Sequence, residues 1–425
     1  MLKAKYFIFI FLMVLSISCK GKRSKSITII DKPALDRLIE DQVQGGYYPF
    51  LYLRLEDTHG QVLYEHGSVN NNLLPDVVIN KDTWIRIWSM SKIVTITIIM
   101  DLIEDDILKL DEPVTKYIPE FENLMVATDL NGISLALSDS VSKICPYELE
   151  PIKPIMTLRH LINHEAGFYY ATTKNECMNS DLADQSIPIA VDGNDLINKF
   201  AKVPLIQQPG ESHFYGLNTT VLGLVAERAT GTDLAGLVEI RMTKKLGING
   251  LKYNLDSDEQ LLPCATGVDT VLRLVRESEL DIFGPAFPTY ASNNRVFLGG
   301  EGMIATAGGY CDFLRIFLNK GMLNGKEFLE VKSINEITSP QTQLDSKWGY
   351  NGYNLWVTGD TLRKSGWGDE GLWQGGGYEG TQFWIDSKRG FVGVLMTQSN
   401  SLQKGAHEFY NDFRGELYKQ IFENE

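Results

Sequence analysis

Residues Trp84–Asp106 read WIRIWSMSKIVTITIIMDLIEDD and contain a long apolar run with few polar breaks. From Ile93 to Ile103, isoleucine, valine, methionine and leucine fall on nearly every side of a helix, as in a helix that is buried all round. The run is too short to cross a membrane, because a membrane span needs about 20 apolar residues. The stretch therefore predicts a helix at the centre of a folded domain.

Ser89 and Lys92 stand at the start of this helix, three residues apart. That spacing places both side chains on one face, and a helix N-terminus favours developing negative charge. A serine hydroxyl becomes a useful nucleophile only when a neighbouring group takes its proton. The same pattern at Ser140–Lys143 and Ser401–Lys404 lies in polar, turn-like sequence, which indicates solvated pairs.

The composition is that of a soluble globular protein. The chain has 425 residues, of which 44% are hydrophobic and 22% charged, enough for one large catalytic domain or two ordinary ones. The net charge of −14 provides no basic surface for phosphate groups, which argues against a nucleic-acid partner.

The N-terminus has the layout of a secretory signal peptide. Lys3 and Lys5 precede the apolar run Tyr6–Ile17, and small residues lead to Cys19. A cysteine at the cleavage point resembles a bacterial lipoprotein signal, in which Cys19 is lipidated; the alternative is an uncleaved anchor. We expect a signal peptide over 1–19, a tether over 20–30 and one domain over 31–425. Such a protein would be exported and anchored to the membrane of the bacterial cell envelope, in the periplasm or at the outer membrane.

The remaining cysteines are candidates for a disulfide, and a histidine pair is a candidate for a zinc site. An exported chain can form disulfides, and Cys145 with Cys177 is a candidate pair among Cys145, Cys177, Cys264 and Cys311. His160 and His164 have the spacing of a two-histidine zinc site. No third ligand is evident, so we favour a structural role and expect no metal.

Helical and strand periodicities predict the order of the elements along the chain. Helices are expected over 34–43, 157–163, 220–230, 234–246, 310–318 and 407–422, and strands over 50–55, 61–66, 353–358, 372–376, 382–385 and 391–397. Residues 122–156 read as irregular. Strands at both ends with helices between them predict an α+β fold, in which an antiparallel sheet is built from both termini and a mostly α-helical lobe is inserted into it.

From Leu35 to about Phe422 the chain resembles the penicillin-recognising serine enzymes, in the branch of class C β-lactamases, related serine esterases and D-alanyl-D-alanine carboxypeptidases. Seven stretches carry the resemblance in the family's order: Arg86–Lys92, Leu110–Phe121, Thr157–Gly167, Gln208–Tyr215, Val221–Gly231, Gly299–Gly308 and Gly380–Asp386. The resemblance implies a β-lactamase/transpeptidase-like fold with flanking helices and an acyl-enzyme mechanism that needs no cofactor.

The resemblance also implies roles for three residues. Ser89 corresponds to the nucleophile, Lys92 to its partner, and Tyr215 to the tyrosine that takes and returns the serine proton. A tyrosine with the ordinary pKa near 10 is a useful base only where a cation stabilises its phenolate, and Lys92 would supply that charge. Without the motif order, a core tyrosine would be the favoured interpretation of Tyr215.

The sequence departs from the family pattern in two motifs. β-Lactamases of this class carry Tyr-x-Asn, whereas Leu217 holds the third position here and Asn218 follows it. The third motif is Lys-Thr-Gly in β-lactamases and His-x-Gly or Trp-Gly-Gly in relatives. Depending on a gap of one residue, Gln374 or Gly375 takes the first position, so no cation is present. Lys364-Ser365-Gly366 lies too early in the chain and is interpreted as a coincidence.

The glycines after Gln374 are candidates for an oxyanion hole. An N–H of Gly376 or Gly377, together with the N–H of Ser89, could hold the oxyanion; the alternative is a bulge without chemistry. Gln374 and Asn218 are further candidates for contact with substrate.

These motifs predict a serine hydrolase that cleaves a small-molecule ester, amide or peptide. The missing cation weakens the grip on a substrate carboxylate, which favours esterase- or peptidase-like activity over efficient β-lactam hydrolysis. Alternatives are a β-lactamase or a D-alanyl-D-alanine carboxypeptidase and, in another class, a non-catalytic ligand-binding or sensor lipoprotein. The sequence leaves open the substrate, the oligomeric state and the pairing of Cys145 with Cys177.

Overall fold

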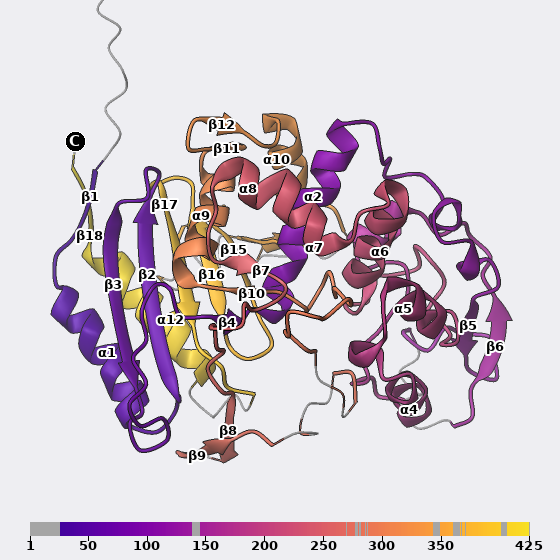
Figure 1. The fold of residues 1–425 in the computed structure, drawn as a ribbon, viewed down its shortest axis with the longest axis horizontal. Helices are drawn as coiled ribbons and strands as arrows, with labels where there is room; N and C mark the ends of the chain where they lie inside the picture. The colour runs from indigo at the N-terminus through magenta and orange to yellow at the C-terminus, as the bar shows by residue number, and fades with distance from the viewer. Residues whose placement is uncertain are drawn as a thin grey trace, which may run out of the picture.

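A seven-stranded antiparallel sheet, in the order β13-β14-β15-β16-β17-β2-β3, forms the frame of the molecule (Figure 1). The computed structural model describes residues 26–424 with gaps at 138–144, 269, 277–278, 280–281, 285, 287, 343–348, 360–365, 367, 370 and 401–405. Strand β2, near the start of the chain, pairs with β17, near its end, from Phe391–Asp57 to Met396–Tyr52. The sheet is therefore built from both ends of the chain, as expected. Its strands are β2 Phe50–Asp57, β3 Val62–Val69, β13 Gly349–Asn351, β14 Trp356–Thr358, β15 Trp373–Gly376, β16 Gln382–Asp386 and β17 Phe391–Met396.

Each face of the sheet is covered by helices because the strands alternate apolar side chains between two cores. On one face, Leu51, Leu53 and Leu55 pack with α1 (Lys32–Gln44) and α12 (Ala406–Gln420). On the other face, Phe50 and Tyr52 join the larger core, which includes α9 (Ala307–Leu318). The predicted helices over 34–43 and 310–318 are confirmed.

The inserted lobe is mostly helical, as predicted, and lies to the right of the sheet in Figure 1. Its helices and those beside it are α3 Leu158–Ile162, α4 Glu176–Asp184, α5 Gly193–Phe200, α6 Asn218–Thr230, α7 Leu234–Leu237, α8 Lys244–Leu246 and α10 Val331–Thr338, with a π-helical turn at Val238–Thr243. The short strands form separate small sheets, of which β5–β6 belongs to the lobe in Figure 1. They are β4 Ile85–Arg86, β10 Ile304–Ala305 and β7 Leu251–Lys252 in one sheet, β5 Met125–Thr128 with β6 Glu148–Pro151, β8 Ala265–Val268 with β9 Val271–Leu274, and β11 Met322–Leu323 with β12 Lys326–Glu327.

Helix α2 (Ser91–Glu104) runs between the sheet and the lobe, and a single 3₁₀ turn at Trp88–Met90 precedes it. Every residue from Ser91 to Leu102 is buried, which confirms the central helix. None of the helices in the described part of the chain is long and apolar enough to cross a membrane.

Three local expectations were wrong. Residues 122–156 were expected to be irregular, but β5 and β6 pair within this region as an antiparallel ladder. The last helix ends at Gln420, and Ile421–Asn424 forms strand β18, which pairs with β1 (Ser26–Ile29). Residues 26–29 are therefore a strand and not part of a tether, because β18 offers them a pairing edge. Cys19 and the rest of the predicted signal lie outside the described residues.

A disulfide joins Cys145 and Cys177, whose Cα atoms are 5.9 Å apart. It closes the segment that carries β6, α3 and the start of α4. Cys264 and Cys311 are free thiols in the core.

Candidate active site

Ser89 is presented by a short, constrained turn. Strand β4 pairs with β10, which brings the chain before Ser89 alongside residues 304–305. Trp88 is fully buried and adopts φ 45°, a left-handed conformation that is uncommon for a bulky residue. The following Ser91 is held in turn, because its hydroxyl accepts the N–H of Met303 at 3.1 Å. Ser89 thus lies at the entrance to α2, partly exposed.

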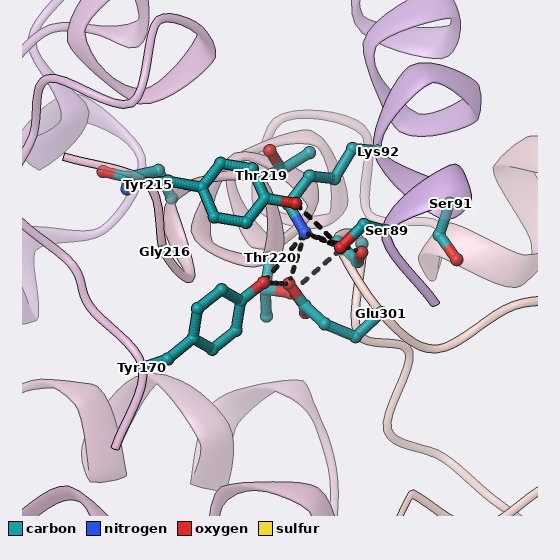
Figure 2. A network of polar contacts seen from close by, with 12 residues as sticks. Ser89, Ser91, Lys92, Tyr170, Tyr215, Gly216, Thr219, Thr220 and Glu301 are labelled. Atoms are coloured by element: carbon teal, nitrogen blue, oxygen red, sulfur yellow. Dashed lines mark hydrogen bonds and ion pairs between the residues drawn. The ribbon is translucent and has the colours of Figure 1, made fainter. Parts of the chain in front are cut away.

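The structure brings the three predicted residues Ser89, Lys92 and Tyr215 together (Figure 2). The hydroxyl oxygens of Tyr215 and Ser89 are 2.7 Å apart, and Lys92 Nζ is 3.2 Å from Ser89 Oγ. A serine with a phenol and an ammonium group in direct contact has the arrangement that an activated nucleophile requires.

Lys92 is almost completely buried, with a relative exposure of 1%. Besides Ser89, its ammonium donates to Tyr170 Oη at 2.8 Å, to the Gly300 carbonyl at 3.0 Å and to Glu301 Oε1 at 2.9 Å. Burial acts to lower the pKa of Lys92, but the charge of Glu301 acts against it and the net shift is upward. Lys92 is therefore a cation in this site.

Tyr215 is 44% exposed, and its ring contacts His164 and Lys92. The ring lies 4.7 Å from that of His164, and Lys92 Nζ lies 4.9 Å from its centroid, within the range of a cation–π contact. Nδ1 of His164 accepts the Gly216 N–H at 3.3 Å, so Nε2 carries the proton and faces Asn354 Oδ1 at 3.0 Å. Burial lowers the pKa of His164 well below its ordinary value, which keeps the imidazole neutral.

Sequence reasoning missed Glu301, Tyr170 and Thr220, which surround Lys92. Glu301 is fully buried; Tyr170 donates to its Oε1, and Thr220 donates to its Oε2 at 2.5 Å. No local pattern in the sequence marks these residues, because they meet Lys92 and one another only through the fold.

The structure does not bring Asn218 into the site. Its side chain is fully buried and donates to the Phe168 carbonyl at 3.0 Å, and it lies 3.2 Å from His164 Nδ1. Asn218 is the first residue of α6, and it supports the turn below Tyr215 instead of facing a substrate.

Gln374 is also directed away from Ser89. Its Oε1 accepts from Arg414 of α12 at 2.5 Å, so the side chain lies on the α12 face of the sheet. Side chains alternate along a strand, and Trp373 accordingly packs against the opposite core, which contains Trp88. The geometry therefore speaks against Gln374 as the first residue of the third motif, whereas Gly375 lies on the same face of the strand as Trp373.

The two candidate oxyanion glycines differ in their hydrogen bonds. The N–H of Gly377 is donated to the Thr381 carbonyl at 2.8 Å. Opposite residues in an antiparallel ladder alternate between bonded and non-bonded pairs, so Gly376, opposite Gln382, directs its N–H away from β16. Pairing with β14 stops at Gln374. The ladder therefore favours Gly376 over Gly377 as an oxyanion donor.

His160 and His164, the candidate zinc pair, do not share a helix face. Nδ1 of His160 accepts the Thr157 N–H at 3.1 Å at the start of α3, whereas His164 lies beyond the end of α3 with φ 56°. Within the described residues, no group of three or more histidine, cysteine, aspartate or glutamate side chains is placed to hold a metal ion. The repeated patterns at 140–143 and 401–404, and Lys364 and Ser365, lie outside the described residues.

Comparisons with known proteins identify the family and the fold of the chain. A family model described as Beta-lactamase matches residues 35–415. The chain is 25% identical over 285 residues to an uncharacterised protein of Mycobacterium tuberculosis and spans 65% of that relative's length. It is 24% identical to the esterase EstB of Burkholderia gladioli, covering 80% of this chain and 84% of the relative.

Among solved structures, one described as EstCE1, a hydrolase with promiscuous acyltransferase activity, superposes with a TM-score of 0.70. The match has 18% sequence identity and covers 91% of this chain and 97% of that one. At this identity the likeness establishes the β-lactamase/transpeptidase-like fold.

Proposed function

The chain belongs to the Beta-lactamase family, and we propose that it is an esterase-like serine hydrolase that acts through an acyl-enzyme on Ser89. The observation that carries the proposal is the contact of Ser89 Oγ with both Tyr215 and Lys92, at 2.7 and 3.2 Å. A non-catalytic binding protein would not need a partly exposed serine between a phenol and a buried ammonium.

Acylation would proceed by attack of Ser89 Oγ on the ester carbonyl carbon. The serine proton passes to the Tyr215 oxygen, and the neighbouring Lys92 ammonium stabilises the phenolate that accepts it. The N–H groups of Ser89 and Gly376 receive the oxyanion. As the carbon–oxygen bond to the leaving group breaks, Tyr215 returns the proton to the departing alkoxide. Water then attacks the acyl-enzyme by the same steps in reverse.

The third motif supports a preference for uncharged esters. The third motif has no lysine, since Gln374 or Gly375 takes its first position, and the Gln374 side chain accepts from Arg414. A carboxylate on a β-lactam or a peptide terminus would therefore lack its charged partner at this strand, at the cost of a strong charge-assisted bond. This favours an esterase over a β-lactamase or a D-alanyl-D-alanine carboxypeptidase.

Acyl transfer to an alcohol is a second candidate activity. It uses the same acyl-enzyme and differs in the acceptor alone. Relatives favour it: EstCE1 is described as a hydrolase with promiscuous acyltransferase activity, and a monacolin J acid methylbutanoyltransferase of Aspergillus terreus is 24% identical over 249 residues.

Hydrolysis of p-nitrophenyl butyrate and of the chromogenic cephalosporin nitrocefin by residues 20–425 would test the activity, with Ser89→Ala as the inactive variant. Ser257→Ala is the matched control, because it removes an exposed hydroxyl that contacts neither Tyr215 nor Lys92. We expect turnover of the ester to exceed that of nitrocefin, to vanish in Ser89→Ala and to persist in Ser257→Ala. Faster turnover of nitrocefin would replace the esterase proposal with a β-lactamase.

Anchoring through Cys19 remains a proposal that is supported by the sequence pattern of residues 1–19. Incorporation of labelled palmitate in a bacterial host, and its loss in Cys19→Ala, is the expected result. Equal labelling of both forms would contradict it.

A further inference from the structure

We propose that Glu301 is a positioning residue that keeps Lys92 as an ammonium ion below Ser89, so that the serine proton passes to Tyr215 and not to Lys92. This inference rests on the proposed acyl-enzyme function and adds a group on which that function depends. Glu301 comes from the loop before β10, more than 200 residues after Lys92 in the chain, and the β4–β10 pairing carries it to the nucleophile.

The carboxylate is fixed by three donors from three separate segments (Figure 2). Oε1 accepts from Lys92 at 2.9 Å and from Tyr170, and Oε2 accepts from Thr220 at 2.5 Å. The Thr220 hydroxyl oxygen also accepts the Gly300 N–H at 3.0 Å, which ties the loop to α6. Hydrogen bonds on both oxygens fix the orientation of this buried carboxylate, and the carboxylate in turn fixes the position of the Lys92 ammonium group.

The three hydrogens of the Lys92 ammonium group are all taken by neighbouring acceptors. The Gly300 carbonyl and the Glu301 carboxylate are acceptors only, so they take two of the three ammonium hydrogens. Tyr170 gives its own proton to Glu301 and can accept the third, in competition with Ser89 Oγ. No lone pair on nitrogen is left to receive the serine proton. The acceptor that remains in contact with Ser89 is Tyr215.

The charges around Lys92 support the same conclusion. The titratable groups that face it are Glu301, Tyr170, Tyr215 and His164, and burial keeps Tyr170 protonated and His164 neutral. Glu301 is thus the carboxylate that neutralises Lys92 among the described residues. Removing one partner of a buried ion pair leaves the other charge without compensation, so an amine without Glu301 would lose its proton more readily.

The test is the pH dependence of Ser89 acylation in wild type and Glu301→Gln, followed as the rate of fluorophosphonate labelling by intact mass. Wild type should lose acylation on the alkaline side only above the ordinary lysine pKa of about 10.4. Glu301→Gln should lose it at a pH lower by about 1 to 3 units, the usual effect of one adjacent opposite charge. At pH 10 its rate should therefore lie roughly 4- to 300-fold below that of wild type. Glu301→Asp, which keeps the charge, should restore the wild-type alkaline limit.

Asp101→Asn is the matched control. Asp101 is a buried carboxylate near the far end of α2, paired with Arg241, away from Ser89. We expect it to lower stability and to leave the pH profile of acylation unchanged.

An unchanged alkaline limit in Glu301→Gln, or an equal loss of rate at every pH, would overturn the proposal. If Glu301→Gln does not fold, the pH profile of wild type decides. Circular dichroism then shows that wild type is still folded at alkaline pH. Loss of acylation well below pH 10 in this folded protein would contradict the proposal that Lys92 is held as an ammonium ion. Failure of the proposed function looks different: wild type itself would not be labelled at Ser89 at any pH.

Discussion

His164 is the residue on which the geometry of Tyr215 depends. It is buried against the Tyr215 ring, 4.7 Å between centroids, and its lowered pKa keeps it neutral in the folded chain. The unfolded chain binds a proton at the ordinary histidine pKa of about 6.5, where the folded chain does not. The stability that comes from neutral His164 is therefore complete above that pH and is lost as the pH falls.

We predict that His164→Gln reduces this pH dependence. Its melting temperature should be lower than that of wild type at pH 8, because the ring contact is lost, and should fall less between pH 7 and pH 5. The measurement is thermal unfolding by circular dichroism at both pH values, with the exposed His59→Gln as control. Parallel melting curves for wild type and His164→Gln across this range would contradict the assignment of the neutral state.

At the same scale, Ser89, Lys92 and Tyr215 could be predicted because their motifs are local: a serine and a lysine one turn apart, and a tyrosine in a recognisable stretch. Glu301 could not be predicted, because its role depends on contacts with α2, α6 and Tyr170 that no local sequence pattern encodes. Asn218 was misjudged for the converse reason. A polar residue next to a motif tyrosine looks available for substrate until its burial is known.

Among the elements, the hairpin β15–β16 is tied to the strand that leads to Ser89. Arg86 of β4 bonds Glu379 in the hairpin turn, at 2.8 and 3.1 Å, and Glu379 is fully buried. This pair sets the distance between the nucleophile and the Gly376 amide, the two sides of the proposed oxyanion hole.

We predict that Glu379→Gln lowers the free energy of unfolding by about 3 to 5 kcal/mol, because it removes one partner of a largely buried ion pair. The acylation rate should fall about 100-fold, as a small misplacement of reacting groups can cause. Urea unfolding and fluorophosphonate labelling measure the two effects. Glu65→Gln, which weakens the more exposed pair with Arg54, should cost no more than about 1 kcal/mol; if Glu379→Gln costs no more than this, the tie is not structural.

The elements themselves were largely predictable, because buried helices and alternating strands leave strong periodic signals. Residues 122–156 were not, since β5 and β6 are short and lie far apart in the sequence. The expectation that Gln374 contacts substrate failed for a geometric reason. A shift of one residue moves a side chain to the other face of a strand, and only the contact of Gln374 with Arg414 shows which face it occupies.

At the scale of the whole molecule, the sheet holds both termini and the lobe carries half of the site. Tyr170, Tyr215 and α6 come from the lobe, whereas Gly376 comes from the sheet, so the docking of the two determines the site. The Cys145–Cys177 disulfide closes a segment of the lobe, with a sequence separation of 32, that includes Tyr170.

We predict that Cys145→Ser/Cys177→Ser lowers the free energy of unfolding by about 2 to 4 kcal/mol, because the unfolded chain regains the freedom of that loop. Dithiothreitol should destabilise wild type similarly and leave the double variant unaffected. Denaturant unfolding with and without the reductant measures this. Equal stability of the two proteins under oxidising conditions would mean that the bridge contributes nothing to folding.

The central claim is that Ser89 is an activated nucleophile, and covalent labelling tests it most directly. Residues 20–425 and the Ser89→Ala variant are incubated with a fluorophosphonate, and the intact mass of each is followed over time. The account predicts a single adduct on wild type and none on Ser89→Ala, with both proteins melting at similar temperatures. A wild-type chain that stays unlabelled, or a variant that is labelled as fast as wild type, would contradict it.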